Sequence, residues 1–334
     1  MSVPGSFDSK EAVLVTGGTG FVGSHLVRHL VHEGLSVHLL VRPQSSYWRI
    51  EDVVPRVTLW HGELTDIASI KRCIAGAQPT TVFHLGASTA GRRWSNDMSI
   101  VESSIDVNLK GTLNLVKALH HADLPIRRII RTGSLLEYGS GPVPYEEGQR
   151  ELPISPYAVS QVATTVFLQA IANNGVNLPV VSLRLGPIYG PAGPSEFLIA
   201  SLVMRCLEGR EFNMSAGTQK RDFVYVADVV DACIKASAAD AATGEIINIG
   251  GGKIYRLREV GEMIVSKIET ATRLNFGDLN ERIGDVGDAY CNNAKAKKLL
   301  GWSPTTSLTD GLDQTIAWYA EHGERMRQLE ARTS

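Results

Sequence analysis

Short apolar runs alternate with longer segments of helical spacing through the first half of the chain. The runs are rich in β-branched residues and leucine with few polar interruptions, which is typical of strands buried on both faces. They predict strands at Ala12–Thr16, Val37–Val41, Val57–His61, Thr81–Leu85, Arg128–Arg131 and Val180–Arg184. Helical spacing predicts helices at Phe21–Glu33, Ile67–Ala75, Val101–His121 and Pro156–Asn173. This order predicts an α/β fold with a Rossmann-type doubly wound parallel sheet.

The pattern changes after Arg184. Residues 186–196 hold three prolines and three glycines, so we expect the chain to leave the sheet there. Further elements are predicted at Phe197–Glu208, Arg221–Val226, Val229–Ala239, Ile246–Ile249 and Leu257–Ile268. We expect residues 1–185 to form a dinucleotide-binding domain to which residues 223–250 return. Residues 186–222 and 251–334 would form a smaller, interleaved C-terminal substrate-binding lobe, with the ligand between the two parts.

Composition limits the partners. The chain has 33 basic and 35 acidic residues, a formal net charge of -2 and no basic stripe, so we expect no nucleic-acid partner. An anionic ligand must then be held by local arginines and helix N-termini. The four cysteines lack metal-ligand spacing, and no apolar run approaches the roughly 18 residues of a membrane helix. The start of the chain has no secretory pattern. We expect a cytoplasmic protein with no metal and no membrane contact.

A glycine-rich turn follows the first predicted strand. Gly17 would allow the tight turn, Gly20 would let a pyrophosphate approach the backbone, and Gly23 would let the next helix pack closely on the strand. The amides at the start of that helix would face the phosphates. Further candidate contacts in the same turn are Thr19, Phe21 and Val22. We therefore expect a dinucleotide site here.

The end of the second predicted strand bears on the choice of cofactor. An acidic residue there would bind the ribose 2′-hydroxyl of NAD, but none follows Val41. Arg42 could pair with a 2′-phosphate, and Ser45 or Ser46 could donate to it. NADP(H) is thus the preferred cofactor, and NAD(H) remains possible.

Eight motifs occur in an order typical of one protein family. They are TGGTGFVG, HLGAS, DVNLKGT, GSLLEYG, SPYAVSQ, LRLGPIYGP, RDFVYVADVV and LGW, from about Val13 to Trp302. Together they resemble the extended short-chain dehydrogenase/reductase family, which includes sugar-nucleotide epimerases, dehydratases and 4-ketoreductases. The resemblance implies a nucleotide-sugar substrate. It also implies a homodimer that pairs through the segments 101–121 and 156–173.

The resemblance also implies the active-site residues. The family's catalytic Ser or Thr matches Ser134, and its Tyr matches Tyr157. The Lys four residues after that Tyr is replaced by Gln161, which could still bind the nicotinamide ribose. Asn108 matches the Asn that shapes the active-site helix. Ser155 and Pro156 are a favourable helix start, so positions 157 and 161 would share one helix face.

Other matching positions are expected to contact ligands. Leu85, Gly86 and Ala87 would line the adenosine side, and Pro187 and Ile188 the nicotinamide side. Glu63 and Leu64, after the third predicted strand, are further candidates for the cofactor site. Arg221 would bind the substrate diphosphate and Arg282 the diphosphate or a ribose, and the alternative for each is a surface or structural ion pair.

Three departures from the family pattern favour one reaction. Without a lysine at position 161, Tyr157 would lack a neighbouring cation and stay protonated, which suits reduction better than oxidation. Pro187 replaces an Asn found in many epimerases, and Leu136 stands where dehydratases have Glu. We therefore expect NADPH-dependent reduction of the C4 keto group of an NDP-4-keto-6-deoxyhexose. The alternatives are an NAD-dependent NDP-sugar epimerase and, because of Gln161, a catalytically silent cofactor-binding sensor.

Overall fold

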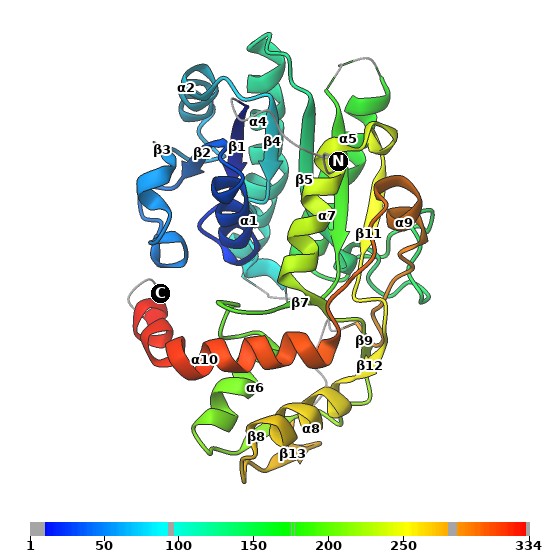
Figure 1. Ribbon diagram of the computed structural model, residues 1–334. Helices are drawn as coiled ribbons and strands as arrows, with labels where there is room; N and C mark the ends of the chain where they lie inside the picture. The colour runs from blue at the N-terminus through cyan, green and yellow to red at the C-terminus, as the bar shows by residue number, and fades with distance from the viewer. Residues whose placement is uncertain (1–10, 93–96, 175, 177, 280–285, 332–334) are drawn as a thin grey trace.

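The computed structural model describes residues 11–92, 97–174, 176, 178–279 and 286–331. Its centre is a parallel seven-stranded sheet with the order β11-β6-β5-β4-β1-β2-β3 (Figure 1). The strands are β1 (Ala12–Thr16), β2 (Ser36–Val41), β3 (Thr58–His61), β4 (Thr81–His84), β5 (Arg128–Ser134), β6 (Val180–Leu185) and β11 (Ile246–Ile249). The strand order reverses between β1 and β4, so the predicted doubly wound fold is confirmed.

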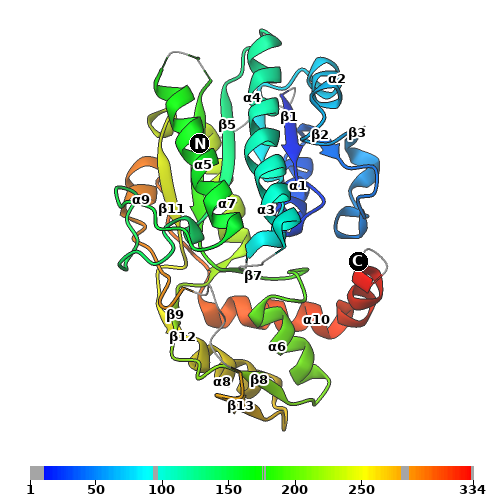
Figure 2. The ribbon, with the colours of Figure 1, turned by 180° about the vertical axis from the view of Figure 1, so that it is seen from behind.

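Helices cover both faces of this sheet. Val13 and Val15 of β1 pack into one core with α1 (Phe21–His32) and α7 (Val226–Ala238). Leu14, which points to the opposite face, packs with α2 (Ile67–Ala77), α4 (Gly111–His121) and α5 (Pro156–Asn173). Figure 1 views the sheet from the α1 and α7 side, and Figure 2 from the α4 and α5 side. Both faces are thus buried, which explains the continuous apolar strands.

The single helix predicted for residues 101–121 is wrong. The segment contains α3 (Met98–Ser104), a π-helical stretch (Ile105–Lys110) and then α4. A π-helical turn accommodates an extra residue and is frequent at functional sites. Here it contains the buried Asn108, whose side chain makes hydrogen bonds to two other segments. Hydrophobic spacing does not reveal such a change of period, because the flanking apolar residues still follow helical spacing.

The second half of the chain builds a smaller lobe below the carboxyl ends of the strands. Its helices are α6 (Leu198–Leu207), α8 (Leu257–Ile268) and α10 (Leu308–Ala331), whereas α9 (Ala294–Leu300) packs beside β11 at the edge of the sheet (Figure 1). Its short strands pair as β7 (Ile188–Tyr189) with β10 (Val224–Tyr225), β9 (Lys220–Arg221) with β12 (Tyr255–Arg256), and β8 (Phe212–Met214) with β13 (Leu274–Phe276). The long helix α10 crosses between the sheet and the α6–α8 layer (Figure 1). The segment predicted as extended at 221–226 is divided among β9, β10 and the start of α7.

Short 3-10 turns connect several of these elements. They are η1 (Trp48–Ile50), η2 (Val54–Arg56), η3 (Ala90–Arg92), η5 (Leu135–Glu137) and η6 (Asp240–Ala242). No helix in the described part of the chain is both long and apolar enough to cross a membrane. The described residues also contain no group of three or more His, Cys, Asp or Glu side chains that could hold a metal ion.

Candidate active site

The glycine-rich turn joins the end of β1 to α1. Gly17 has a φ of 73°, and a Cβ there would lie 2.7 Å from the backbone of Leu85 and Gly86. A Cβ on Gly23 would lie 2.1 Å from the carbonyl oxygen of Gly17. Neither position leaves room for a side chain, because in both cases the opposing atoms belong to the backbone. The turn is therefore pressed against the β4 loop on one side and against α1 on the other.

The start of α1 fits an anionic ligand. Gly20 is its N-cap residue and provides no side chain to cap the helix, and the first turn holds no acidic residue. Thr19 and Val22 are half-buried, while Phe21 is buried in the second hydrophobic core. Uncapped amides at a helix N-terminus favour phosphate oxygens. These residues fit the pyrophosphate of a dinucleotide.

The end of β2 presents the side chains that were predicted to select the cofactor. Arg42 is exposed, and its carbonyl oxygen accepts a hydrogen bond of 3.0 Å from the amide of Ser45. Ser45 and Ser46 are half-buried. The turn thus places all three residues at the same carboxyl edge of the sheet as the glycine-rich turn.

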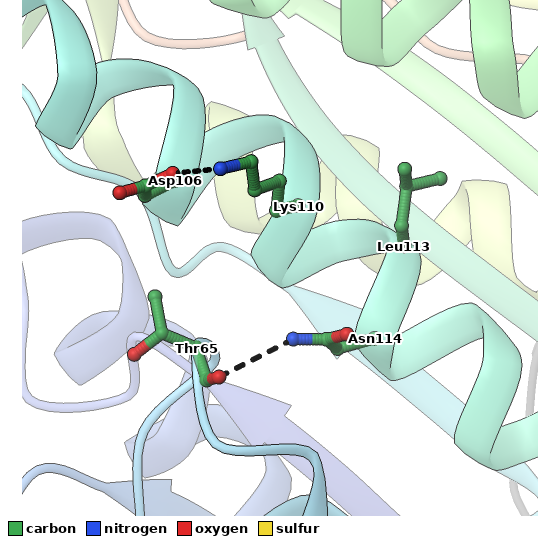
Figure 3. Close-up of a pocket in the computed structure, with 5 residues that line it drawn as sticks. All are labelled: Thr65, Asp106, Lys110, Leu113 and Asn114. Carbon is green, nitrogen blue, oxygen red and sulfur yellow. Dashed lines mark hydrogen bonds and ion pairs between the residues drawn. The ribbon is translucent and has the colours of Figure 1, made fainter.

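The loop after β3 is fixed by α4. The side-chain amide of Asn114 donates to the carbonyl oxygens of Leu64 and Thr65, at 3.0 and 3.5 Å, and Figure 3 shows the bond to Thr65. Thr65 and Asn114 line a hollow of about 430 Å³ together with Leu113 and the ion pair of Asp106 and Lys110. Glu63 lies beside the hollow in sequence, and its amide donates to the Ser69 hydroxyl. None of the predicted catalytic residues lines this hollow.

A buried histidine connects the cofactor turn to the helices. His84 Nδ1 lies 2.7 Å from the Thr16 hydroxyl and its Nε2 lies 2.8 Å from the Thr112 hydroxyl. The Thr16 hydroxyl also accepts from the amide of Gly86, in the loop with Leu85 and the exposed Ala87. Burial, assisted by the nearby Arg131, lowers the pKa of His84 to about 3. His84 is therefore neutral and structural.

Asn108 joins the β4 loop to helix α5. Its Oδ1 accepts from the amide of Ser88 at 2.7 Å, and its Nδ2 donates to the Ser88 carbonyl and to the Ser160 hydroxyl. Ser160 in turn donates to the carbonyl oxygen of Tyr157. The expected effect of Asn108 on the shape of the active-site helix agrees with these contacts, while a direct contact with the cofactor stays a prediction.

Ser134 and Tyr157 lie together at the carboxyl end of β5. Each is 7% exposed, and the Ser134 hydroxyl lies near enough to Tyr157 to act on the pKa of its phenol. Ser134 is the N-cap of η5 and forms a capping box with Glu137, whereas Tyr157 is in the first turn of α5. Burial raises the pKa of Tyr157, although the charges of Arg92 and then Arg131 act to lower it.

Gln161 is buried and accepts hydrogen bonds from an arginine. Its side-chain Oε1 and its carbonyl oxygen both accept hydrogen bonds from the guanidinium of Arg131, on β5. A second guanidinium, that of Arg92 in η3, lies 5.8 Å from the ring of Tyr157. The expectation that Tyr157 lacks a neighbouring cation is therefore wrong, because two arginines from other parts of the chain approach it.

Neither Arg131 nor Arg92 was recognised from the sequence as a charge near Tyr157. Arg131 and Arg184 lie in strands read as apolar, and a charge inside a buried strand requires a partner. That partner is Glu137, which accepts from Arg131 at 3.3 Å and from Arg184 at 2.8 Å. The signal was available as two arginines in neighbouring buried strands, which require a buried carboxylate partner. Arg92 carried no such signal.

A cavity of about 670 Å³ opens on the lobe side of the sheet, and Arg92, whose guanidinium lies 5.8 Å from the Tyr157 ring, is part of its wall, whereas Tyr157 and Ser134 are not. Its wall includes Arg92, Leu136, Pro187, Ile188 and Arg221. The cavity is therefore lined both by Pro187 and Ile188, which were expected beside the nicotinamide, and by Arg221, which was expected to bind the substrate diphosphate.

The guanidinium of Arg221 has structural partners within this wall. It donates to the carbonyl oxygens of Lys220, Val286 and Gly287, and the residue is 9% exposed. Arg221 thus holds the 286–287 segment as well as facing the cavity. Arg282 lies outside the described residues.

The chain is similar to many known proteins over most of its length. Residues 13–250 match the model of the NAD dependent epimerase/dehydratase family. The UDP-glucuronate 4-epimerase of Thermodesulfobacterium geofontis is 28% identical, over 95% of this chain and 98% of that relative. The UDP-glucose 4-epimerase of Mycolicibacterium smegmatis is 29% identical, over 92% and 97%. The solved UDP-glucose 4-epimerase of Thermotoga maritima with UDP-glucose has a TM-score of 0.84 and 27% identity, over 92% and 98%. The chain belongs to the NAD dependent epimerase/dehydratase family.

Proposed function

We propose that the protein inverts the configuration at C4 of a nucleotide sugar and that the natural substrate is a UDP-sugar. The family is compatible with this reaction class, and the 4-epimerases named above support both the reaction class and the substrate class. The observation that carries the proposal for this chain is that Tyr157 and Ser134 lie close together, one residue away from the 670 Å³ cavity through Arg92, which contacts the Tyr157 ring and lines the cavity. This volume falls within the range of about 300–1,000 Å³ that is usual for ligand sites.

Tyr157 and Ser134 would handle the proton of the sugar. In the oxidative direction, the Tyr157 oxygen takes the proton of the C4 hydroxyl while the Ser134 hydroxyl donates a hydrogen bond to the same sugar oxygen. In the reductive direction, Tyr157 returns the proton. Hydride transfer is the chemistry that the dinucleotide supplies when bound. Both side chains are nearly excluded from water, which strengthens these interactions.

Two arginines near Tyr157 favour epimerisation over simple reduction. An epimerase must first remove a hydroxyl proton, and a positive charge near the phenol favours the phenolate that does so. Arg92 and Arg131 provide such charges, in spite of Gln161. The argument for a reductase depended on their absence.

A 4-ketoreductase is the second candidate, because one observation favours it. Burial outweighs the two arginines, so the pKa of Tyr157 is raised overall. A protonated tyrosine is the form that donates to an alkoxide during reduction. Leu136 lines the cavity where a dehydratase would place a carboxylate, which disfavours dehydration.

The cofactor and the phosphate contacts are proposed on local grounds. The exposed Arg42 favours NADP(H), whereas solved relatives were obtained in complex with NAD. Arg221 is proposed to face the substrate diphosphate because it lines the cavity. In an Arg221→Ala variant, UDP binding should weaken more than dinucleotide binding; equal weakening would make Arg221 purely structural.

The deciding experiment compares substrates and cofactor use. The purified protein is denatured to identify the dinucleotide that it retains, and the native protein is incubated with UDP-glucose or UDP-glucuronate. An epimerase yields both C4 epimers, resolved by proton NMR, without net consumption of cofactor. A reductase leaves these sugars unchanged and consumes NADPH in proportion to an NDP-4-keto-6-deoxyhexose. Dinucleotide binding with no turnover of any of these compounds would contradict both and leave the sensor.

A further inference from the structure

Helix α5 carries Tyr157 but no charge of its own. From Pro156 to Asn173 the sequence contains no Asp, Glu, Lys, Arg or His. Position 161, one turn after Tyr157, holds the buried Gln161. Any fixed charge that acts on the phenol must therefore come from elements packed against α5.

Arg131 reaches α5 from the sheet. Its guanidinium donates to the carbonyl oxygen of Gln161 at 3.2 Å, to the Gln161 side chain, and to the Thr165 hydroxyl at 2.6 Å. It also pairs with Glu137 at 3.3 Å. Arg131 is 2% exposed. These contacts fix a buried cation against the two helical turns that follow Tyr157.

Arg131 shares its carboxylate partner with a second arginine. Glu137 is shared between Arg131 and Arg184, and all three are nearly or fully inaccessible to water. The other carboxylate on Arg184, Glu151, lies at the partly exposed edge with 21% of its side chain accessible. Two buried cations thus share one fully buried anion. Among the described residues, the carboxylate that pairs with Arg131 is therefore one that it shares with Arg184, at the longer of the two distances.

The remaining charged neighbours are few. Arg92 approaches the phenol ring from the cavity side, at 5.8 Å. His84 of β4 is neutral, and Asp106 and Lys110 of the π-helical stretch pair with each other at the surface. Arg131 is therefore the buried cation that Tyr157 meets from the protein interior among the described residues.

We propose that Arg131 is a positioning residue that replaces the missing lysine of α5, with Gln161 and Thr165 as the groups that hold its charge beside Tyr157. The inference rests on the proposed function only in taking Tyr157 as the residue that transfers the proton. Arg131 acts through the field at the phenol oxygen and does not contact the substrate. An opposite charge within a few ångströms favours an ionised group, here the phenolate, by about 1–3 pH units. A shift of about one unit is expected here, because Glu137 offsets part of the charge of Arg131.

The test is a titration of Tyr157 that requires no sugar substrate. Near-ultraviolet phenolate absorbance is recorded against pH for the dinucleotide-loaded protein, and the same curve for Tyr157→Phe is subtracted to isolate Tyr157. Arg131→Met should raise the midpoint by about one unit, a tenfold lower phenolate fraction at neutral pH. Arg131→Lys, which keeps the charge, should recover most of the shift. An unchanged midpoint in folded Arg131→Met overturns the proposal.

A charge-relocation variant covers the case in which Arg131→Met fails to fold. Arg131→Gln combined with Gln161→Lys keeps the net charge of the cluster and moves it to the helix. If Arg131 supplies the cation in the native protein, the midpoint stays within about half a unit of the native value. A midpoint about one unit lower would show that a lysine adds a charge that Arg131 never supplied, and would overturn the proposal. Because no turnover is measured, an absence of epimerase activity leaves this result interpretable.

Discussion

Asp222 is a buried carboxyl group whose surroundings make a quantitative prediction possible. It lies between β9 and β10 and is 1% exposed. One carboxyl oxygen accepts from the amide of Cys291 at 3.1 Å and from its thiol at 3.5 Å, while the other has no hydrogen-bond partner in the described part of the chain. Burial raises the pKa of Asp222 from 3.8 to about 7, in spite of the Cys291 amide.

The shift translates into stability with a definite sign. Because the folded pKa is raised, the stabilisation is complete below about pH 4, where both states are protonated, and it is lost as pH rises toward 7. A difference of about three pH units corresponds to roughly 4 kcal/mol. Asp222→Asn cannot ionise. It should therefore match the native protein near pH 4 and exceed it by up to about 4 kcal/mol above pH 7.

Urea unfolding of both proteins across this pH range provides the measurement. The comparison must be made at each pH, because His84 acts in the opposite direction. Its pKa is lowered from 6.5 to about 3, so both proteins lose stability as pH falls through this interval. The difference between the two proteins cancels that effect. A difference that stays constant with pH would refute the assignment of a buried, reluctantly ionised Asp222.

Three further predictions concern the cofactor and the assembly. Gly23→Ala places a Cβ 2.1 Å from the Gly17 carbonyl oxygen. The variant should therefore be less stable by about 1–3 kcal/mol and bind the dinucleotide more weakly. An unchanged melting temperature and unchanged binding would contradict the close packing. Arg42→Ala should weaken NADPH binding by one to two decades in calorimetry and leave NADH binding nearly unchanged, since a charge-assisted contact contributes about 1.5–3 kcal/mol; an equal loss for both cofactors would refute phosphate selection. Helix α5 exposes Val166 (51%) and Phe167 (41%), so Val166→Glu with Phe167→Glu should convert the expected homodimer into a monomer in sedimentation, and an unchanged mass would exclude these two residues from the interface.

The sequence predicted the sheet domain well because its elements carry strong patterns. Helix α5 was placed at its observed bounds, since Ser155 and Pro156 mark its start, and most first-half elements agree within two residues. The pairs β8–β13 and β9–β12 have strands of two or three residues, too short for any periodicity to register. Helix α10 was not predicted.

The candidate site was likewise predicted only in part. The glycine-rich turn and the pair Ser134 and Tyr157 follow from local spacing and a resemblance. The charges that surround Tyr157 come from η3, β5 and η5, and no local pattern brings these segments together. The prediction from Gln161 failed for this reason: a missing charge at one position is informative only when the neighbours in space are known.

The strand order bears on which fragments of the chain can fold separately. Strand β11, from residues 246–249, pairs with β6 and closes that side of the sheet, although about sixty residues of the lobe separate the two in sequence. A fragment that ends at residue 185 would expose the hydrogen-bonding groups of β6 and the apolar face that α7 covers. Such a fragment should aggregate rather than bind dinucleotide. A protease that cuts within the lobe would instead leave two pieces held together through the paired β6 and β11.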